Sequence, residues 1–427
     1  MTEEDIKRLN YIKYTAFRVW VRKPHCILYC VCFHVLRVFI YTLKCRFGNR
    51  KLNDILFAGH TINNQKSFKT ILENLDIEKC SIWSDFYKSL PMAQIYIRSL
   101  AYFHLFLSMY FHSSKEDKLL IRTFYTDFIN ACATYKELEK LLLRNANLKM
   151  IVLANDHALV NRCLIELGEK HHIKTLYVQH ASVTESFPSL RFDYSFLDGM
   201  ESYEKYKKVG NMRGKVFLSG SPRFDAFHSY RSVDKKYDVG IALNALDSPD
   251  IALQLCLYLK NTYSFNIIVR PHPSMLCGLF DETKFTENGF SVSDPRKDLS
   301  YVFLSCINVM VANESSIHLD AALMGVHSFL YNFSDNKIMD WYSYIRRGLI
   351  KVCDNFDEVG KMLKSTYALP VNAIQYYAAS FHSPMDGRVG EMIAIFIKKM
   401  IYDSELSAQN YMDSIMKNNA EYAEYRY

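Results

Sequence analysis

The sequence predicts an α/β protein with two doubly wound parallel sheets. Short apolar runs bounded by turn signals recur along the chain, and helical spacing follows most of them, which is typical of buried parallel strands. This alternation occurs twice, on either side of a polar stretch at 228–236. At 427 residues and 49% hydrophobic content, the chain can bury two ordinary cores.

The first alternation begins at 53–59, an apolar run that ends in a glycine turn. Aromatic-rich residues with helical spacing fill 67–147, and we expect them to be core helices. Strand and helix signals then alternate to the end of the first half. The expected strands are 150–154, 175–178, 192–197 and 215–218, with a helix running through Gly168.

The second alternation predicts strands at 237–243, 265–269, 307–311, a run ending at Tyr331, and 349–352, with helices at 251–259, 356–363 and 392–401. We therefore expect two Rossmann-like domains facing each other across a cleft. Their expected limits are 51–232 and 233–400. An N-terminal helical arm over 1–50 and a polar tail over 401–427 flank them.

The N-terminal arm is basic and partly apolar. Its apolar run at 26–33 is too short to span a bilayer, and no signal-peptide cleavage site follows it. One interpretation is an amphipathic helix lying on an anionic membrane surface, and the other is an arm packed on the domain. The basic residues before the run are Lys7, Arg8, Lys13, Arg18, Arg22 and Lys23.

Composition and motifs bear on the cellular location of the protein and on the ligands it could bind. Eleven cysteines without a Cys-x-x-Cys motif favour reduced thiols, which predicts a cytoplasmic protein. The membrane interpretation of the N-terminal arm would make it peripheral at the inner face of the plasma membrane. A net charge of +7 is mild for this length, so no nucleic acid partner is expected. The stretch 210–215 mimics a P-loop but precedes a strand, and no dinucleotide or metal motif occurs. We expect no metal and no cofactor.

Two loops of the second half carry groups suited to phosphate. The first places Arg270 and His272 after a strand, with prolines on both sides of the histidine that fix the turn. The second places Ser315 and Ser316 where a helix should begin, after Glu314, which could contact a ribose. The structural alternatives are a turn histidine, an ordinary helix cap, and an Arg270 pair with Asp294 or Glu314.

Four motifs in order resemble the GT-B transferases that use cytidine-activated donors. They are Val178-Gln179-His180, Gly220-Ser221-Pro222-Arg223-Phe224-Asp225, Arg270-Pro271-His272-Pro273 and Glu314-Ser315-Ser316. That family includes CDP-glycerol glycerophosphotransferases and the sialyl- and Kdo-transferases. The match departs at His180-Ala181, where the glycerophosphotransferases have His-Gly, and at Ser221 and Phe224.

The resemblance implies a GT-B fold and assigns roles to residues of the first half. His180 is implied as the base that deprotonates the acceptor by analogy with the glycerophosphotransferases, whereas the sialyltransferase pattern favours a carboxylate, Asp156 or Glu185. We rank them in that order, noting that 155–157 could equally cap a helix. Arg223 could clamp an anionic sugar or phosphate, or pair with Asp225 or Glu201.

The prediction is a metal-independent glycosyltransferase that moves an acidic sugar of the Kdo or sialic-acid type. Its donor would be CMP-activated, and its acceptor a glycan or lipid-linked glycan of a bacterial capsule or lipopolysaccharide. The first alternative is a CDP-glycerol glycerophosphotransferase of teichoic-acid-like polymers. Other classes are a nucleotide-sugar epimerase of GT-B fold and an inert membrane-bound scaffold.

Overall fold

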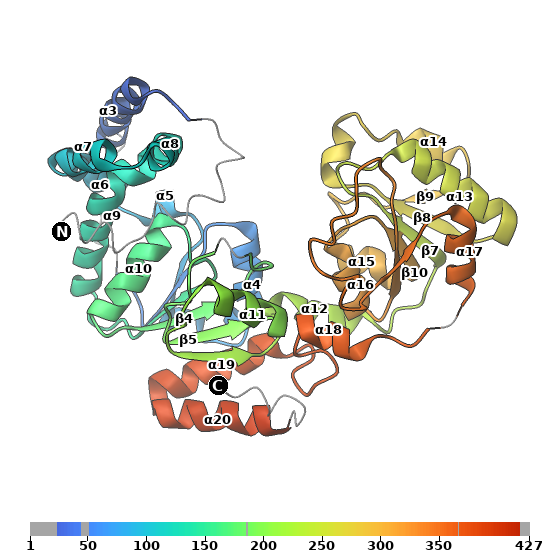
Figure 1. Ribbon diagram of the computed structural model, residues 1–427. Helices are drawn as coiled ribbons and strands as arrows, with labels where there is room; N and C mark the ends of the chain where they lie inside the picture. Colours follow the sequence, from blue (N-terminus) through green and yellow to red (C-terminus); the bar gives the residue numbers. More distant parts are fainter. Residues whose placement is uncertain (1–23, 44–50, 185–186, 366, 419–427) are drawn as a thin grey trace. The chain divides into compact units, whose positions relative to one another are not determined.

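The computed structural model describes residues 24–43, 51–184, 187–365 and 367–418. The chain divides into two compact units (Figure 1). Unit 1 comprises 1–223 and 388–427, and unit 2 comprises 224–387. The boundary thus lies earlier than the one expected at 232/233, and the C-terminal segment belongs to unit 1 instead of following unit 2.

Unit 1 contains a six-stranded parallel sheet of order β2-β1-β3-β4-β5-β6. Chain direction across the sheet reverses between β1 and β3, so this is its topological switch point. The strands are β1 (Ile55–Ala58), β2 (Cys80–Trp83), β3 (Met150–Leu153), β4 (Lys174–Val178), β5 (Tyr194–Leu197) and β6 (Lys215–Leu218). Four of them are buried along their whole length or nearly so, as parallel strands covered on both faces should be.

The helices of unit 1 confirm the expected helical region and add the C-terminal pair. They are α3 (Ile27–Leu43), α4 (Ile62–Leu72), α5 (Phe86–Ser89), α6 (Met92–Ala101), α7 (Phe103–His112), α8 (Lys115–Thr123), α9 (Tyr125–Arg144), α10 (Leu159–Lys170), α11 (Met200–Val209), α19 (Val389–Lys398) and α20 (Glu405–Asn418). A capping box starts α4, because Thr61 Oγ1 accepts from the Asn64 amide while Asn64 Oδ1 accepts from the Thr61 amide.

The C-terminal segment packs on unit 1 through α19, which contacts α4. On α20, Glu405 pairs with Lys174 Nζ at 3.0 Å and accepts a hydrogen bond from the Tyr194 hydroxyl. Those two residues begin β4 and β5. The expected helix at 392–401 is therefore real, but it covers the first sheet and not the second.

Unit 2 contains a second six-stranded parallel sheet, of order β12-β11-β10-β7-β8-β9, with its switch point between β7 and β10. Its strands are β7 (Tyr237–Ala242), β8 (Ile267–Arg270), β9 (Ser291–Val292), β10 (Ile307–Ala312), β11 (His327–Tyr331) and β12 (Lys351–Cys353). Its helices are α12 (Asp225–Tyr230), α13 (Pro249–Tyr263), α14 (Glu282–Thr286), α15 (Ser300–Ser305), α16 (Ile317–Leu323), α17 (Phe356–Lys364) and α18 (Val371–Tyr377).

The α/β fold with two parallel sheets is confirmed, and the strands that the sequence did not predict are β2 and β9. Both lie at an edge of their sheet. The β2 strand is exposed or half-buried at its two middle residues, and β9 has only two residues, both half-buried. Neither therefore has the continuous apolar run that marks a central parallel strand.

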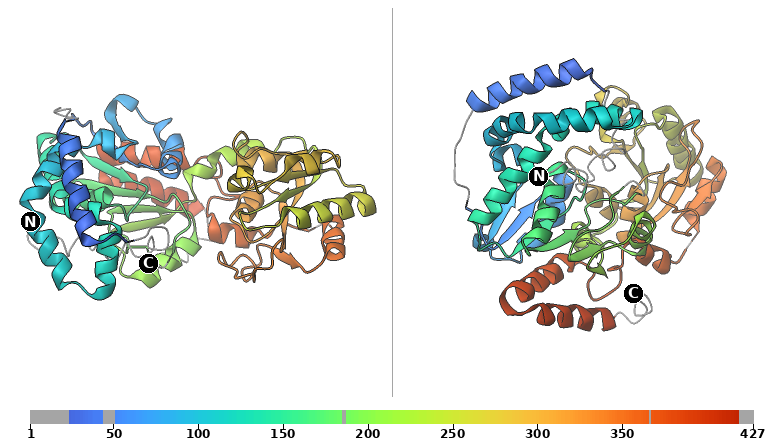
Figure 2. Two further views of the ribbon diagram at one scale, coloured as in Figure 1. Left: turned by 90° about the horizontal axis from the view of Figure 1, so that it is seen from above. Right: turned by 60° about the vertical axis from the view of Figure 1, so that its left-hand side comes forward.

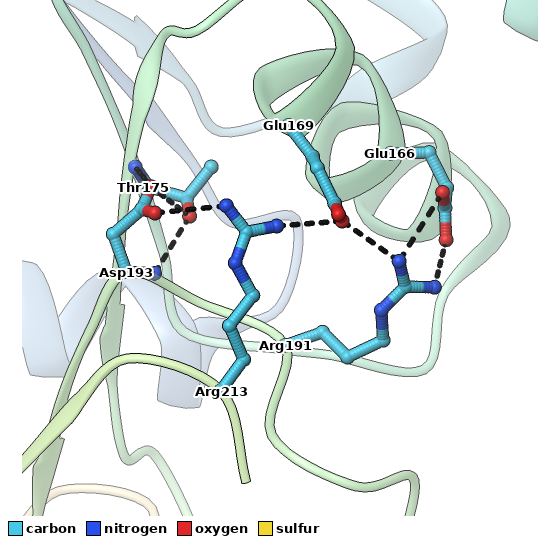
Figure 3. Close-up of polar contacts among 6 residues, drawn as sticks. All are labelled: Glu166, Glu169, Thr175, Arg191, Asp193 and Arg213. Carbon is cyan, nitrogen blue, oxygen red and sulfur yellow. Dashed lines mark hydrogen bonds and ion pairs between the residues drawn. The ribbon is translucent and has the colours of Figure 1, made fainter.

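An ionic network closes the amino-terminal edge of the first sheet (Figure 3). Arg213 pairs with Glu169 at 2.6 Å and with Asp193 at 3.0 Å, and Asp193 accepts two hydrogen bonds from Thr175. The turn before β6 needs Gly214, whose φ is +69° and whose added Cβ would lie 2.2 Å from the Asp193 carbonyl oxygen. The P-loop-like stretch at 210–215 thus lies at the sheet edge where parallel sheets do not bind ligands.

Candidate functional site

Polar side chains of unit 1 gather at the opposite, carboxyl-terminal edge of its sheet. Asp156, just after β3, is fully buried. Its carboxylate accepts a hydrogen bond from the Tyr206 hydroxyl at 3.1 Å and contacts His157 Nδ1 at 3.1 Å. The Tyr206 hydroxyl also lies 3.1 Å from that of Tyr177. Asp156 is therefore held in a fixed position by Tyr206 of α11 and by His157 of the loop that follows β3.

His157 uses both ring nitrogens inside this network. Its Nε2 lies 3.0 Å from the Asn155 amide nitrogen, opposite the Nδ1 contact with Asp156. Asn155 Oδ1 also accepts from the backbone amides of His157 and Ala158, which forms the turn into α10. Asn155 thus forms a turn ahead of α10, but it does not cap that helix, whose N-cap residue is Ala158 and makes no side-chain cap bond. Asp156 faces the buried network.

His180, two residues after β4, lies beside this network. The His157 and His180 ring centroids are 6.2 Å apart. Burial, reinforced by His157 and opposed by Asp156, lowers the pKa of His180 to about 4. Its Nδ1 is buried and has no hydrogen-bond partner among the described residues. A neutral imidazole with an uncommitted nitrogen can accept a proton at physiological pH.

Arg223 lies at the end of this edge but is already paired. Its Nη2 contacts Asp198 Oδ2 at 2.6 Å, and its Nη1 donates to the His180 carbonyl oxygen at 3.4 Å. Burial raises the pKa of Asp198 and Arg223 opposes that rise. Glu201, one of the partners considered for Arg223, instead pairs with Lys205. Arg223 thus orders the strand ends around His180.

Sequence reasoning missed Asp198 and Tyr206 as members of this cluster, whereas it placed His157 beside Asp156 after the same strand. Asp198 directly follows β5, so the strand-end rule that found Asp156 would also have found it. Tyr206 lies on α11 and reaches Asp156 across 50 positions of sequence. No local pattern marks such a contact. Glu185, the third expected base, lies outside the described residues.

A cavity of about 530 Å³ opens at the switch point of the same sheet. Its volume is in the usual range of small-ligand sites. Its lining combines apolar residues, among them Leu90, Ile95 and Phe124, with polar residues, among them Asp127 and Asn130. The amide oxygen of Asn130, a residue 4% exposed, has no hydrogen-bond partner among the described residues. The remaining lining residues are His60, Ser84, Asp85, Phe86, Met92, Tyr96, Thr126, Thr134, Ala158, Leu159 and Val160.

In unit 2, His272 has an exposed ring with one ring nitrogen hydrogen-bonded to Ser274. Its Nδ1 accepts a hydrogen bond from the Ser274 amide at 3.2 Å and lies 2.8 Å from Ser274 Oγ. Because Nδ1 is an acceptor here, the neutral ring carries its proton on Nε2. The turn therefore holds an N–H donor in a defined orientation at the end of β8.

Arg270 and Glu314 are engaged in contacts within unit 2. Arg270 is buried and donates to Ser293 Oγ and to the Asp298 carbonyl oxygen, each at 2.8 Å. It thus forms neither of the pairs considered, with Asp294 or Glu314. The Glu314 carboxylate accepts from the Met339 amide at 2.9 Å and from the Trp341 amide. These contacts indicate structural roles for both side chains.

Ser315 and Ser316 follow β10, on the other side of β7 from His272. Ser315 Oγ accepts weakly from the Ile317 amide at 3.4 Å, and the exposed Ser316 makes no side-chain capping bond to α16. Two strand spacings put the ends of β8 and β10 about 10 Å apart. The two loops share one sheet edge, at a separation suited to different groups of one ligand rather than to one phosphate oxygen.

Between these loops lies a buried network that the sequence did not predict. Asn313 donates to Asp247 Oδ1 at 2.7 Å, and Asp247 Oδ2 accepts from the Asn244 amide at 2.7 Å. Burial raises the pKa of Asp247. His318 is buried, and its Nε2 lies 3.1 Å from the Asn313 carbonyl oxygen. The network fixes the backbone that carries Ser315 and Ser316.

Comparisons with known proteins show the fold. No protein-family model matches the chain, and no curated protein does. UDP-GlcNAc 2-epimerase from Neisseria meningitidis, bound to UDP-GlcNAc, is similar in structure at 10% identity and a TM-score of 0.51, over 82% of this chain and 100% of that one. UDP-GlcNAc 2-epimerase from Methanocaldococcus jannaschii is 14% identical with a TM-score of 0.49, and the match covers 82% of this chain and 99% of that one. The wall teichoic acid polymerase TagF is 13% identical with a TM-score of 0.46, and the match covers 88% of this chain and 97% of that one.

This likeness confirms the two-domain α/β architecture of the GT-B type. At such low identity it shows the fold alone. Function is argued below from the residues.

Proposed function

We propose that this protein is a GT-B enzyme that binds a nucleotide-activated donor in unit 2 and transfers its glycosyl group to an acceptor bound in unit 1. The observation that carries the proposal is His180, a buried neutral imidazole whose Nδ1 has no partner among the described residues. It lies at the sheet edge where α/β proteins bind ligands. Such a group suits proton abstraction from an acceptor hydroxyl.

Donor binding is assigned to the carboxyl-terminal edge of the unit 2 sheet. His272 offers its Nε2–H, and Ser315 and Ser316 offer hydroxyls from the far side of β7. These donors can hydrogen-bond phosphate oxygens, and the charge that grows on a leaving phosphate strengthens such bonds. The Neisseria epimerase of the same fold holds UDP-GlcNAc, which supports a nucleotide sugar as the ligand class.

Acceptor binding is assigned to the unit 1 cavity. Its aromatic and aliphatic lining residues suit the apolar face of a sugar ring, and its carboxylate, amide and hydroxyl groups suit sugar hydroxyls. Neither Lys nor Arg is among the lining residues. The cavity therefore favours a neutral acceptor over a phosphorylated one.

In the transfer step, the acceptor oxygen forms a bond to the anomeric carbon while the bond from that carbon to the donor phosphate breaks. The nucleotide leaves with the electron pair, and the acceptor proton passes to His180. Asp156 and His157 act as positioning residues, because they pack beside His180 and set its electrostatic surroundings. Arg223 fixes the His180 backbone.

We propose a nucleotide-activated neutral sugar as the donor, in place of the CMP-activated acidic sugar that the resemblance implies. An acidic sugar needs a cation for its carboxylate. Arg223 pairs with Asp198 and Arg270 is buried against Ser293, so the two arginines expected at the site are both engaged within their units. The cytidine preference rests on the family resemblance alone.

A nucleotide-sugar epimerase is the second candidate. Two buried carboxylates, Asp156 and Asp198, lie near His180, and an epimerase of this fold needs acid and base groups around one sugar. The Neisseria structure belongs to this class of enzyme.

The test has two stages. A thermal-shift panel of CMP, CDP, UDP and GDP identifies the nucleotide, because a ligand selective for the native state raises the melting temperature. The matching nucleotide sugar is then incubated with the protein without an acceptor. Conversion to an epimer supports the epimerase, whereas an unchanged sugar that is consumed only when neutral glycans are added supports the transferase. No shift with any of the four nucleotides contradicts both.

A further inference from the structure

Helix α3 has an inward face anchored by polar contacts. His34 is buried and its Nε2 lies 2.8 Å from Ser99 Oγ on α6. Arg37 donates to Thr126 Oγ1 on α9 at 3.1 Å, and Tyr41 stacks on Tyr96 with ring centroids 4.6 Å apart. The histidine, the arginine and a tyrosine of α3 are thus turned toward the protein.

The outward face of α3 is apolar. Leu28, Phe39 and Leu43 are 70%, 63% and 72% exposed, and the spacing of the exposed residues places them on one stripe of the helix. Single exposed apolar residues are ordinary, but a continuous stripe marks an interaction surface. The exposed large apolar residues of α3 are Leu28, Tyr29, Val35, Leu36, Phe39, Ile40 and Leu43. Figure 2 shows α3 running along the outside of the unit 1 helices.

The sequence around α3 is strongly basic. Residues 6–53 contain no Asp or Glu and eleven Lys or Arg. Since the net charge of the whole chain is +7, the remainder of the chain is net negative. The basic residues are Lys7, Arg8, Lys13, Arg18, Arg22, Lys23, Arg37, Lys44, Arg46, Arg50 and Lys51. They lie on both sides of the apolar helix.

We infer that α3 lies in the interface of an anionic phospholipid bilayer, with its apolar stripe among the acyl chains, and that the basic sequence around it favours anionic headgroups. Apolar burial and electrostatic attraction together give stable interfacial binding where either one alone is marginal. A second copy of this chain is disfavoured as the partner, because it would bring a second strongly basic segment to the first. Among the described helices, none is long and apolar enough to cross a membrane.

Membrane binding through α3 would place the unit 1 cavity next to the bilayer. Tyr96 and Thr126, which α3 contacts, both line that cavity. Resting on the proposed function, this makes a lipid-anchored glycan the acceptor class. The binding step itself needs no catalysis, so its test stands apart from the test of the transferase.

The experiment is flotation of the full chain with large unilamellar vesicles of pure phosphatidylcholine or of phosphatidylcholine with 40% phosphatidylglycerol. We expect binding to the anionic vesicles in 100 mM NaCl, much weaker binding in 500 mM NaCl, and weak binding to neutral vesicles. The double variant Leu36→Glu/Phe39→Glu should lower the partition coefficient on the order of 100-fold, because two inserted apolar side chains become charged.

The matched control is Leu246→Glu/Leu279→Glu, which adds the same charges at apolar residues of unit 2 that are 75% and 67% exposed. This control should bind anionic vesicles as the unmodified protein does, and both variants should keep its circular dichroism. Equal binding by the α3 variant, equal loss by the control, or no binding by the unmodified protein would overturn the inference. So would a change from dimer to monomer in the α3 variant by sedimentation, which would identify the stripe as a contact between copies.

Discussion

The sheet edges of the two units differ in how their polar groups are held. In unit 1, Asp156, His157 and His180 are all buried, and Tyr206 locks the carboxylate. In unit 2, His272 and Ser316 are exposed. Burial keeps a histidine in the neutral form that can accept a proton, whereas exposed donors on short turns suit reversible binding of a charged ligand. The difference in burial is the basis on which the proposed function assigns proton transfer to unit 1 and donor binding to unit 2.

The strongest test of that division is His180→Ala. We expect kcat with the nucleotide sugar identified above to fall on the order of 1000-fold, with little change in nucleotide affinity, because the variant loses the base and not the donor site. The matched control is His104→Ala, an exposed histidine on α7, which should keep full turnover. Full activity in His180→Ala together with loss of activity in Asp156→Asn would assign the base to the carboxylate.

The pH profile of kcat sharpens the same prediction. The pKa of His180 is lowered from 6.5 to about 4, so the imidazole stays neutral and competent as a base from pH 7 down to about pH 5. Turnover should therefore decline only as the pH approaches 4. A decline centred near pH 6.5 would show that an unshifted histidine, and not His180, governs the rate.

The next largest effect is expected for Arg223→Ala. This change removes the partner of the buried Asp198 carboxylate. Removing one partner of a buried ion pair lowers the free energy of unfolding by about 3–5 kcal/mol. Because Arg223 is partly exposed, we expect a loss near the lower figure. Urea denaturation measures it. The double variant Arg223→Ala/Asp198→Asn should recover part of the loss, since a neutral amide is cheaper to bury. No recovery would mean that Arg223 stabilises unit 1 through other contacts.

The smallest effects are expected in unit 2. His272→Ala and the double variant Ser315→Ala/Ser316→Ala should each raise the nucleotide Kd roughly tenfold, because each removes hydrogen bonds to a charged group. Calorimetry measures the affinity, and kcat at saturating donor should change little. The control is Thr286→Ala, an exposed residue that hydrogen-bonds only within α14. Unchanged affinity in both unit 2 variants would remove the donor site from this edge.

The sequence alone determined the sheets and the edges at which polar groups gather. Buried parallel strands need continuous apolar runs, and such runs marked β3, β4, β7 and β10. Since ligand loops follow the carboxyl ends of these strands, His180 and His272 were predictable as site candidates. The basic character of the first fifty residues was equally evident, because charge is a property of composition.

Tertiary structure alone decided which of the candidate side chains are paired within the protein and which can contact a ligand. Arg223 meets Asp198, Arg270 meets Ser293, and Glu314 meets the 339–341 backbone, each across more than twenty positions of sequence. It also decided that α19 returns to unit 1 and that α3 turns Arg37 inward and Phe39 outward. The reason is physical: a side chain's partner and burial depend on elements packed against it, and packing joins segments that no local pattern connects.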